Sequence, residues 1–312
     1  MNYTEETALF GCAGDTLLGI LAKPETPVDT GVIVIVGGPQ YRVGSHRQFV
    51  LLSRALAAAG YPVLRFDYRG MGDSEGKPRD FQAVSADIAA AIDALQERMP
   101  SVEQVALWGL CDGASAALLY CYETHDPRVS GLCLLNPWVR SEASLARTQV
   151  KHYYVQRLMQ KEFWVKLLRG GVALKALTGL MRNIRMAFTG TVDSGEVASA
   201  SGRSTASQLP FQHRMAAAWN SFNGRIFLLL SSEDYTAKEF LEYASNDIAW
   251  KNAFVHPRLV RHDVHGVDHT FSSAVSRAKA EALTLTKGLT PQTDPSEHGD
   301  RALTEVRESD IA

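Results

Sequence analysis

Runs of apolar residues alternate with amphipathic stretches along most of the chain. Residues 31–36 and 104–107 are runs of β-branched and aliphatic side chains, which are typical of strands covered on both faces. Residues 49–59 and 84–98 instead place apolar side chains at helical spacing. Strands that alternate with helices in this way form right-handed crossovers between parallel strands. The pattern therefore predicts an α/β fold with a mostly parallel central sheet and helices on both faces.

The sheet is expected to continue on both sides of this region. Two apolar-rich runs, residues 6–12 and 16–22, are joined by a glycine-containing turn and predict an N-terminal hairpin. Further runs at residues 129–135, 225–230 and 258–264 predict three later strands.

The pattern changes between residues 139 and 220, where amphipathic helices occur without a strand-like run. We interpret residues 139–220 as a helical cap inserted into an α/β core that consists of residues 1–138 and 221–288. Residues 289–312 are polar and mix proline with charge without periodicity, which predicts a disordered tail.

Composition narrows the class of partner. With 312 residues, of which 46% are hydrophobic and 21% charged, the chain can bury a full core. A formal net charge of −2 offers no basic face for nucleic acid. The N-terminus lacks the pattern of a secretory signal, and no stretch has the roughly 18 to 20 apolar residues that cross a bilayer. We expect a cytoplasmic protein without stable membrane insertion, and its oligomeric state is left open.

Four cysteines without CxxC spacing argue against a disulfide framework and against a zinc knuckle. The sequence also lacks the HExxH, P-loop and GxGxxG patterns. Neither a metal nor a nucleotide cofactor is therefore implied, and the four thiols are expected to be reduced.

The candidate nucleophile lies in residues 108–114, Trp-Gly-Leu-Cys-Asp-Gly-Ala, where a strand pattern breaks and continues as a helix former. Strand, sharp turn and helix together indicate a nucleophile elbow, whose middle residue is held at strained backbone angles above the carboxyl edge of a sheet. Cys111 is therefore expected to face a cleft. The alternative is a small core side chain, because free cysteine is among the most buried residue types.

A thiol at neutral pH is only a few per cent thiolate, so it needs a base or a lowered pKa. His269, in the loop after the last predicted strand, is the expected base, with His262 and His265 as nearby alternatives. Asp234 follows a strand that should lie beside the histidine strand and suits a carboxylate that orients the imidazole. Glu233 is the rival for this role.

The oxyanion hole is expected to use backbone N–H groups from Asp112 and from the loop after the strand at residues 32–36. Pro39 has no N–H, so Gly38 is the better donor of this loop and Gln40 the second. The alternative is that the two glycines form only a tight turn. The Asp112 side chain is expected to point away along the helix.

In their order along the chain, these motifs resemble the α/β-hydrolase superfamily over residues 6–287. The resemblance rests on Gly-Gly-Pro after a buried strand, on residues 66–74 (Phe-Asp-Tyr-Arg-Gly-Met-Gly-Asp-Ser), on the elbow, and on Asp234 and His269. It implies the fold, and it implies that residues 66–74 order the loop beside the elbow. More narrowly, the elbow and residues 37–49 resemble the type-one hydrolase associated with the exosortase A system. That family is encoded beside bacterial exopolysaccharide and protein-sorting genes, and the resemblance supplies no substrate.

The expected reaction is acyl transfer from a small-molecule ester or thioester to Cys111 and then to water. Cysteine elbows also occur in dienelactone hydrolases and polyester synthases, where the acceptor is water or a growing hydroxyacyl chain. An acyltransferase is therefore the nearest alternative, and a non-catalytic binding module of the same fold is the second.

Overall fold

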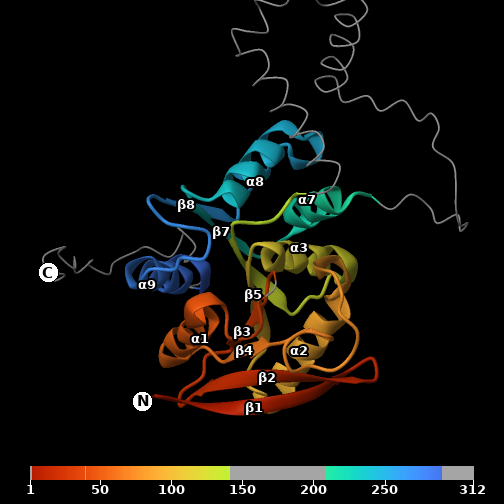
Figure 1. Ribbon diagram of the computed structural model, residues 1–312, viewed down its shortest axis with the longest axis vertical. Helices are drawn as coiled ribbons and strands as arrows, with labels where there is room; N and C mark the ends of the chain where they lie inside the picture. Colours follow the sequence, from red (N-terminus) through yellow and green to blue (C-terminus); the bar gives the residue numbers. More distant parts are fainter. Residues whose placement is uncertain (1, 39, 141–208, 290–312) are drawn as a thin grey trace, which may run out of the picture.

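The computed structural model describes residues 2–38, 40–140 and 209–289 (Figure 1). These residues form an eight-stranded sheet in the order β1-β2-β4-β3-β5-β6-β7-β8. Only β1 with β2 and β2 with β4 pair antiparallel, which confirms the predicted mostly parallel sheet. The strands are β1 (Tyr3–Cys12), β2 (Asp15–Pro24), β3 (Thr30–Ile35), β4 (Val63–Phe66), β5 (Gln104–Leu110), β6 (Val129–Leu135), β7 (Arg225–Ser231) and β8 (Leu259–Val264).

The N-terminal hairpin forms where the sequence predicts it and is longer at both ends. Ala13 and Gly14 connect β1 to β2 with φ angles of 51° and 93°. Two successive positive φ angles give the turn a twist that matches the twist of the strands, and glycine adopts such angles readily. The hairpin then adds antiparallel strands to one edge of the sheet through β4.

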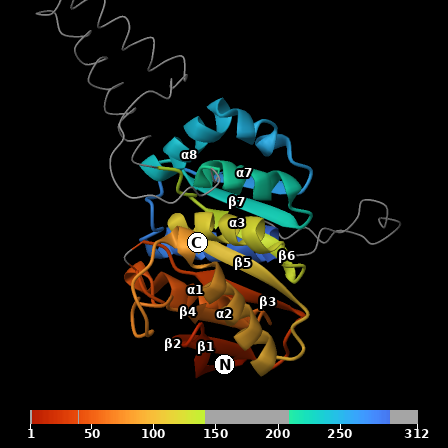
Figure 2. The same cartoon turned by 90° about the vertical axis from the view of Figure 1, so that its right-hand side faces the viewer.

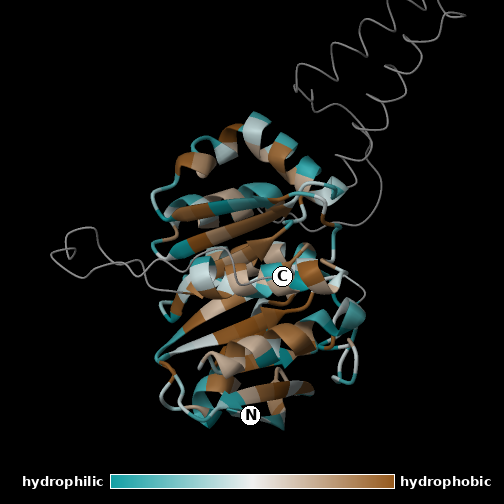
Figure 3. Cartoon of the chain, turned by 90° about the vertical axis from the view of Figure 1, so that its left-hand side faces the viewer, coloured by the Kyte–Doolittle hydropathy of each residue, from teal (hydrophilic) through white to brown (hydrophobic). Residues whose placement is uncertain are grey.

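Helices cover both faces of the sheet. Figure 1 shows α1 and α9 on one face and α2, α3 and α7 on the other, and Figures 2 and 3 show these two faces in turn. The apolar strands, brown in Figure 3, separate two clusters of buried side chains, one beneath each helix layer. The α-helices of the described residues are α1 (Gln48–Ala58), α2 (Ser85–Arg98), α3 (Asp112–Thr124), α7 (Phe211–Ser221), α8 (Tyr235–Asn246) and α9 (Ala274–Leu283).

Helix α7 belongs to the core layer, although the sequence pattern assigned its residues to the inserted cap. Its Met215 and Trp219 side chains are fully buried, and the helix packs on α3. The Trp219 indole lies 5.6 Å from the Trp250 ring and donates a hydrogen bond to the Ala253 carbonyl at 2.9 Å. The predicted boundary at residue 220 is therefore too late, because the apolar face of α7 resembles that of any amphipathic cap helix.

The remaining residues of the predicted cap, 141–208, lie outside the described residues. The tail from residue 290 onward lies outside them as well. Leu289, which the sequence pattern assigned to the tail, is instead a buried residue at the end of a π-helical turn, Thr284–Leu289. Within the described part of the chain, no helix is long and apolar enough to span a membrane.

Parallel strands bring their carboxyl ends to one edge of the sheet, and the candidate residues follow those ends. Cys111 comes directly after β5, Asp234 follows β7, and His269 follows β8. Because β5, β6, β7 and β8 are successive neighbours in the sheet, loops far apart in sequence meet at this edge.

Candidate active site

The turn after β5 has the geometry of a nucleophile elbow. Cys111 has φ 61° and ψ −125°, angles that L-residues rarely adopt, and it precedes the first residue of α3. Glycine is required on both sides, because a Cβ atom at Gly109 would collide with the backbone of Gly113, and one at Gly113 would collide with the Ile35 carbonyl. Strand and helix can therefore approach closely enough to present the thiol, which is half-buried, at the edge of the sheet.

The Cys111 backbone is also fixed by the neighbouring strand. Its N–H donates to the Leu135 carbonyl at 2.9 Å, and its carbonyl accepts from the Trp138 N–H at 3.2 Å. The Ser115 hydroxyl donates to the Trp138 carbonyl at 2.6 Å, which joins α3 to the segment after β6. These bonds hold the strained residue from both sides.

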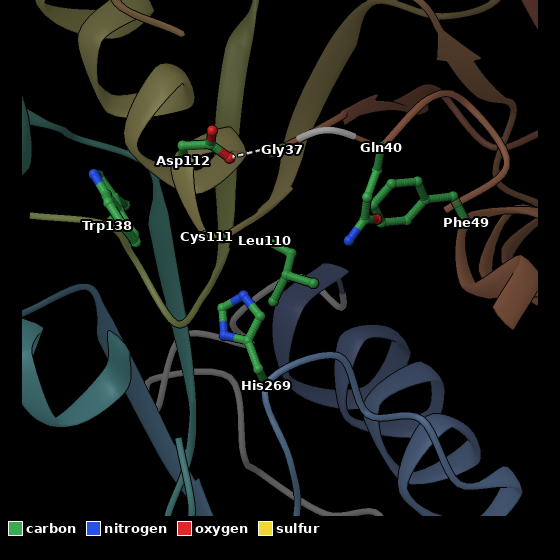
Figure 4. A pocket seen from close by; sticks show the side chains of 9 residues that line it. Gly37, Gln40, Phe49, Leu110, Cys111, Asp112, Trp138 and His269 are labelled. Carbon is green, nitrogen blue, oxygen red and sulfur yellow. Dashed lines mark hydrogen bonds between the residues drawn. The ribbon is translucent and has the colours of Figure 1, made fainter. Parts of the chain in front are cut away.

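His269 lies between Cys111 and Asp234. Its Nδ1 is 2.7 Å from Oδ2 of Asp234, and because a carboxylate has no proton to give, Nδ1 is the donor. On its other side, the imidazole faces Cys111, whose thiol contributes to the raised pKa of His269. In Figure 4 the imidazole points into the cavity from the β8 side, toward the elbow. The structure thus brings the three predicted residues into one continuous chain of contacts.

The surroundings of His269 favour its protonated form. The hydrogen bond to Asp234 and then the interaction with Cys111 raise its pKa to about 10 from the ordinary 6.5, although burial opposes the shift. An imidazolium next to a thiol favours the thiolate, which is the nucleophilic form of cysteine.

Asp234 is fixed by the start of α8. It is buried, and its carboxylate caps the helix by accepting from the N–H groups of Thr236 at 3.0 Å and Ala237 at 3.3 Å. A carboxylate held by three hydrogen bonds has little freedom to rotate away from the imidazole. Its rival Glu233 is exposed and accepts a bond from its neighbour Ser232 at 3.1 Å.

The other candidates near His269 lie elsewhere. His262 belongs to β8, and His265 is exposed in the turn that follows. Asp268 accepts hydrogen bonds from the N–H groups of Thr270 at 3.1 Å and Ser272 at 3.0 Å. It therefore orders the loop that carries His269.

A cavity of about 290 Å³ opens in front of Cys111 (Figure 4). Phe49, Leu110 and Trp138 give it apolar walls, and His269 and Gln40 bring polar groups to it. Among the described residues there is no group of His, Cys, Asp and Glu that could hold a metal ion. The cavity is suited to an apolar group attached to a reactive carbonyl.

The oxyanion loop differs from the prediction at Gly38. Its N–H donates to Oδ1 of Asp112 at 2.5 Å, so it is not available to an oxyanion in this structure. The Asp112 side chain thus turns back toward the loop after β3 and does not point away along α3. Burial raises the pKa of Asp112, while bonds from the N–H groups of Gly38 and Gly113 oppose the shift. These contacts correct the expectation that Gly38 is the better donor.

Gln40 enters the cavity with its side chain. Its Oε1 accepts a hydrogen bond from the Ser45 N–H at 3.3 Å, which directs the amide nitrogen away from that bond. Figure 4 shows this nitrogen on the cavity side, across from Trp138. From the sequence, only the backbone N–H of Gln40 is expected to take part, because no local sequence pattern reveals the direction of its side-chain amide.

Ion pairs anchor this loop. Arg42 bonds to the fully buried carboxylate of Asp67 through both its backbone N–H, at 2.7 Å, and its guanidinium. The same guanidinium reaches Asp73 at 2.6 Å. The Ser74 hydroxyl donates to the Asp67 carbonyl at 2.8 Å, and Arg69 pairs with Asp87 at 2.9 Å. These bonds give residues 66–74 the structural role that the resemblance implied.

Asn136 is a site-supporting residue that the sequence argument missed. It is fully buried directly after β6, with φ 45°, and its amide nitrogen donates to the His269 carbonyl at 3.2 Å and to Ser231 Oγ at 3.0 Å. Its oxygen accepts from the Ser231 N–H at 2.9 Å. An amide placed immediately after the apolar run of residues 132–135 is the sequence signal that could have identified it.

The three other cysteines occupy different surroundings. All three are buried, and burial raises the pKa of Cys121 and of Cys133 to about 12 and that of Cys12 above its ordinary value. Thiols of this kind remain protonated at neutral pH and react slowly.

Sequence comparison supplies a family. Residues 29–187, about half of the chain, match a family model described as serine aminopeptidase, S33. Human protein ABHD12B is 33% identical over 86 residues, which cover 28% of this chain and 23% of that protein. The quorum-quenching protein AidA of Acinetobacter baumannii is 36% identical over 105 residues, 31% of this chain and 33% of that protein. The chain thus spans a third or less of the length of these curated relatives.

Solved structures agree on the fold. An esterase of Pyrococcus furiosus superposes with a TM-score of 0.58 at 17% identity, covering 90% of this chain and 88% of that one. A dienelactone hydrolase of Anabaena variabilis superposes with a TM-score of 0.55 at 11% identity, covering 91% and 96%. At these identities the similarity establishes the α/β-hydrolase fold alone.

Proposed function

Because the chain belongs to the serine aminopeptidase S33 family of α/β-hydrolases, we propose that it is an esterase or thioesterase with a cysteine nucleophile. One observation carries the proposal. His269 is hydrogen-bonded to Asp234, and it lines the same cavity with apolar sides as Cys111, whose thiol helps to raise the pKa of the imidazole. Nucleophile, base and orienting carboxylate in this order are the groups that acyl transfer requires.

The first half of the reaction forms an acyl-enzyme. His269 takes the proton of the Cys111 thiol, and the sulfur lone pair forms a bond to the substrate carbonyl carbon while the carbonyl π pair moves to oxygen. When the carbonyl re-forms, the bond to the leaving alcohol or thiol breaks. The imidazolium returns its proton to that leaving group, and Asp234 stabilises the imidazolium throughout.

The second half releases the acid. His269, now neutral, takes a proton from water, whose oxygen attacks the carbonyl carbon of the thioester. Collapse of this intermediate breaks the carbon–sulfur bond, and the proton returns to sulfur. Free acid and thiol remain, so atoms and charge balance over the cycle.

A cysteine nucleophile supports a second candidate, an acyltransferase. A thioester intermediate reacts readily with acceptors other than water, so the same three residues can pass the acyl group to a second alcohol or thiol. The two candidates differ only in the acceptor of the second half-reaction. A non-catalytic binding module is less well supported, because it has no need for the Asp234 and Cys111 contacts of His269.

The finer family assignment is also a proposal. The Gly-Leu-Cys-Asp-Gly-Ala sequence of the elbow and the Gly-Gly-Pro-Gln-Tyr-Arg sequence that begins at Gly37 support a place among the type-one hydrolases of the exosortase A system. A link to bacterial exopolysaccharide production follows from that resemblance. The four free thiols fit the cytoplasmic location proposed from the sequence.

Mass spectrometry of the intact protein and its peptides tests the proposal. After brief incubation with panels of acyl thioesters and activated esters, we expect one acyl group on the peptide that contains Cys111. The group should disappear with time in water and should be absent from the Cys111→Ala variant. Acylation of Cys121 or Cys133, or no acylation with any member of either panel, would contradict a cysteine hydrolase.

Adding small alcohols or thiols to the same incubation separates the two candidates. A hydrolase releases free acid at a rate that these acceptors barely change. An acyltransferase diverts most of the acyl group into a new ester or thioester.

A further inference from the structure

We propose that the side-chain amide of Gln40 is a catalytic oxyanion donor, because the Gly38 N–H that would ordinarily fill this role is bonded to the Asp112 carboxylate. The inference rests on the proposed acyl transfer at Cys111. It names the group that stabilises the intermediate, in place of the backbone donor that the sequence suggested.

The contact between Asp112 and Gly38 occupies the backbone donor of the loop. At 2.5 Å it is a short bond to a carboxylate, and bonds to charged groups are about twice as strong as bonds between neutral ones. The carboxylate also lines the cavity, so an oxyanion that approached Gly38 would meet a negative charge. The Gly38 N–H is therefore a poor donor to an oxyanion, because it is already hydrogen-bonded and because a negative charge lies beside it.

A second feature is the direction of the Gln40 amide. Only an oxygen can accept from the Ser45 N–H, so the bond at 3.3 Å determines which end of the amide lies toward Ser45. The nitrogen, which carries two N–H donors, therefore lies on the cavity side, as Figure 4 shows. Gln40 and Cys111 line the same cavity.

A third feature is rigidity. An oxyanion donor is effective only when it is already positioned before charge develops. Two residues beyond Gln40, Arg42 forms ion pairs with Asp67 and Asp73. The Asp67 side chain is fully buried. The amide is therefore carried by a short, anchored segment.

The donors act when sulfur adds to the substrate carbonyl. Sulfur donates a lone pair to the carbonyl carbon, the π pair becomes a negative charge on oxygen, and the proton of the thiol resides on His269. The oxygen then accepts from the Asp112 backbone N–H and from Nε2 of Gln40. No group outside the site is needed.

Kinetics of the Gln40→Ala and Gln40→Glu variants test the inference. Loss of one oxyanion donor lowers kcat by about 10²-fold, and we expect KM to change by less than about threefold. Gln40→Glu keeps the shape and the oxygen but replaces the donor with a charge, so it should be at least as slow. The exposed Gln82→Ala variant serves as the unaffected control, and thermal melting verifies that each variant is folded.

A double-mutant cycle separates the amide from a general effect on the loop. Asp112→Ala frees the Gly38 N–H. In that background, Gln40→Ala should therefore lower kcat by only about 10-fold. Asp112→Asn keeps an oxygen for Gly38, so there Gln40→Ala should still cost about 10²-fold. Equal costs in the Asp112→Ala and Asp112→Asn backgrounds would overturn the role of Gly38 in the inference.

A second readout does not depend on turnover. An alkyl trifluoromethyl ketone adds to a cysteine thiolate to give a tetrahedral oxyanion, whose dissociation constant should rise by about 10²-fold in Gln40→Ala. If the wild type forms this adduct in a Gln40-dependent way but hydrolyses no ester, the inference stands and the proposed function fails. If esters are hydrolysed and both readouts are unchanged in Gln40→Ala, the inference fails alone. If the wild type does neither, both fail.

Discussion

The histidine side and the oxyanion side of the cavity both face Cys111, but they are held by different interactions. On the histidine side, Asn136 and Ser231 form a buried network of neutral groups that ends on the His269 carbonyl, and a single carboxylate holds the ring. On the oxyanion side, Arg42 bridges two carboxylates. Neutral networks fix position without biasing charge, whereas the ion pairs and the Asp112 contact set the charge around the developing oxyanion.

This difference predicts that substitutions on the two sides change different quantities, either the rate of the reaction or the stability of the fold. Changes on the histidine side should slow the chemical step in a folded protein. Changes to the ion pairs on the oxyanion side should first lower stability, because a buried charge loses its partner.

The largest effect is expected from His269→Ala. Removing the base leaves the thiol protonated and the leaving group without a proton donor, so kcat/KM for an activated ester should fall by about 10⁴-fold. Circular dichroism should show an intact fold. The exposed His265→Ala is the matched control; loss of activity there with activity retained in His269→Ala would reverse the assignment.

On the oxyanion side, Arg42→Ala should lower the free energy of unfolding by about 3 kcal/mol. The variant leaves the Asp67 carboxylate, which is fully buried, without its counter-charge. Urea denaturation measures the effect. Arg54→Ala removes a partly exposed pair with Glu5, and its effect should stay below about 1 kcal/mol. Equal losses in these two variants would mean that the Arg42 pair is no more than a surface contact.

Asn136 offers a sharper test of the neutral network. Asn136→Gly relieves the positive φ angle but removes the amide, so kcat should fall by about 10-fold and the free energy of unfolding by about 1–3 kcal/mol. Asn136→Ala should be less stable again, because alanine is strained at φ 45°. A changed KM with unchanged kcat in Asn136→Gly would argue against a role in positioning His269.

The last effect concerns pH. The pKa of His269 in the folded protein, about 10, lies above the ordinary 6.5, so the folded state binds the proton more tightly than the unfolded state does. This stabilisation is complete below about pH 6.5 and is lost as pH rises toward about 10. The difference in unfolding free energy between wild type and His269→Gln should therefore shrink over that interval. If the difference in unfolding free energy stayed constant or increased with pH, folding would not favour the imidazolium.

Much of this structure could be predicted because it depends on local pattern. The strands, the elbow and the positions of Asp234 and His269 follow from periodicity, from the glycines around Cys111 and from the rule that parallel strands end at one edge. The choice between Asp234 and Glu233 needed the structure, because both follow β7 and only a side-chain direction separates them.

The predictions that failed depend on contacts between distant segments. The turn of Asp112 toward Gly38 joins residues 74 positions apart, and its direction depends on how closely α3 approaches the loop after β3. The assignment of α7 to the cap failed because the amphipathic pattern of a helix does not say which surface it covers. The surface that Met215 and Trp219 cover is formed by α3 and Trp250, which are distant in the sequence.

The backbone angles of Cys111 have a consequence for engineering. A side chain at φ 61° and ψ −125° carries strain of about 1–3 kcal/mol, which glycine would not carry. Glycine is ordinarily less stabilising than alanine, yet here Cys111→Gly should melt several degrees above Cys111→Ala, and a reversed order would show that the turn is relaxed. Selection of variants by heat resistance alone would therefore favour proteins that have lost their nucleophile, so thermal screens of this chain need a parallel selection for the thiol.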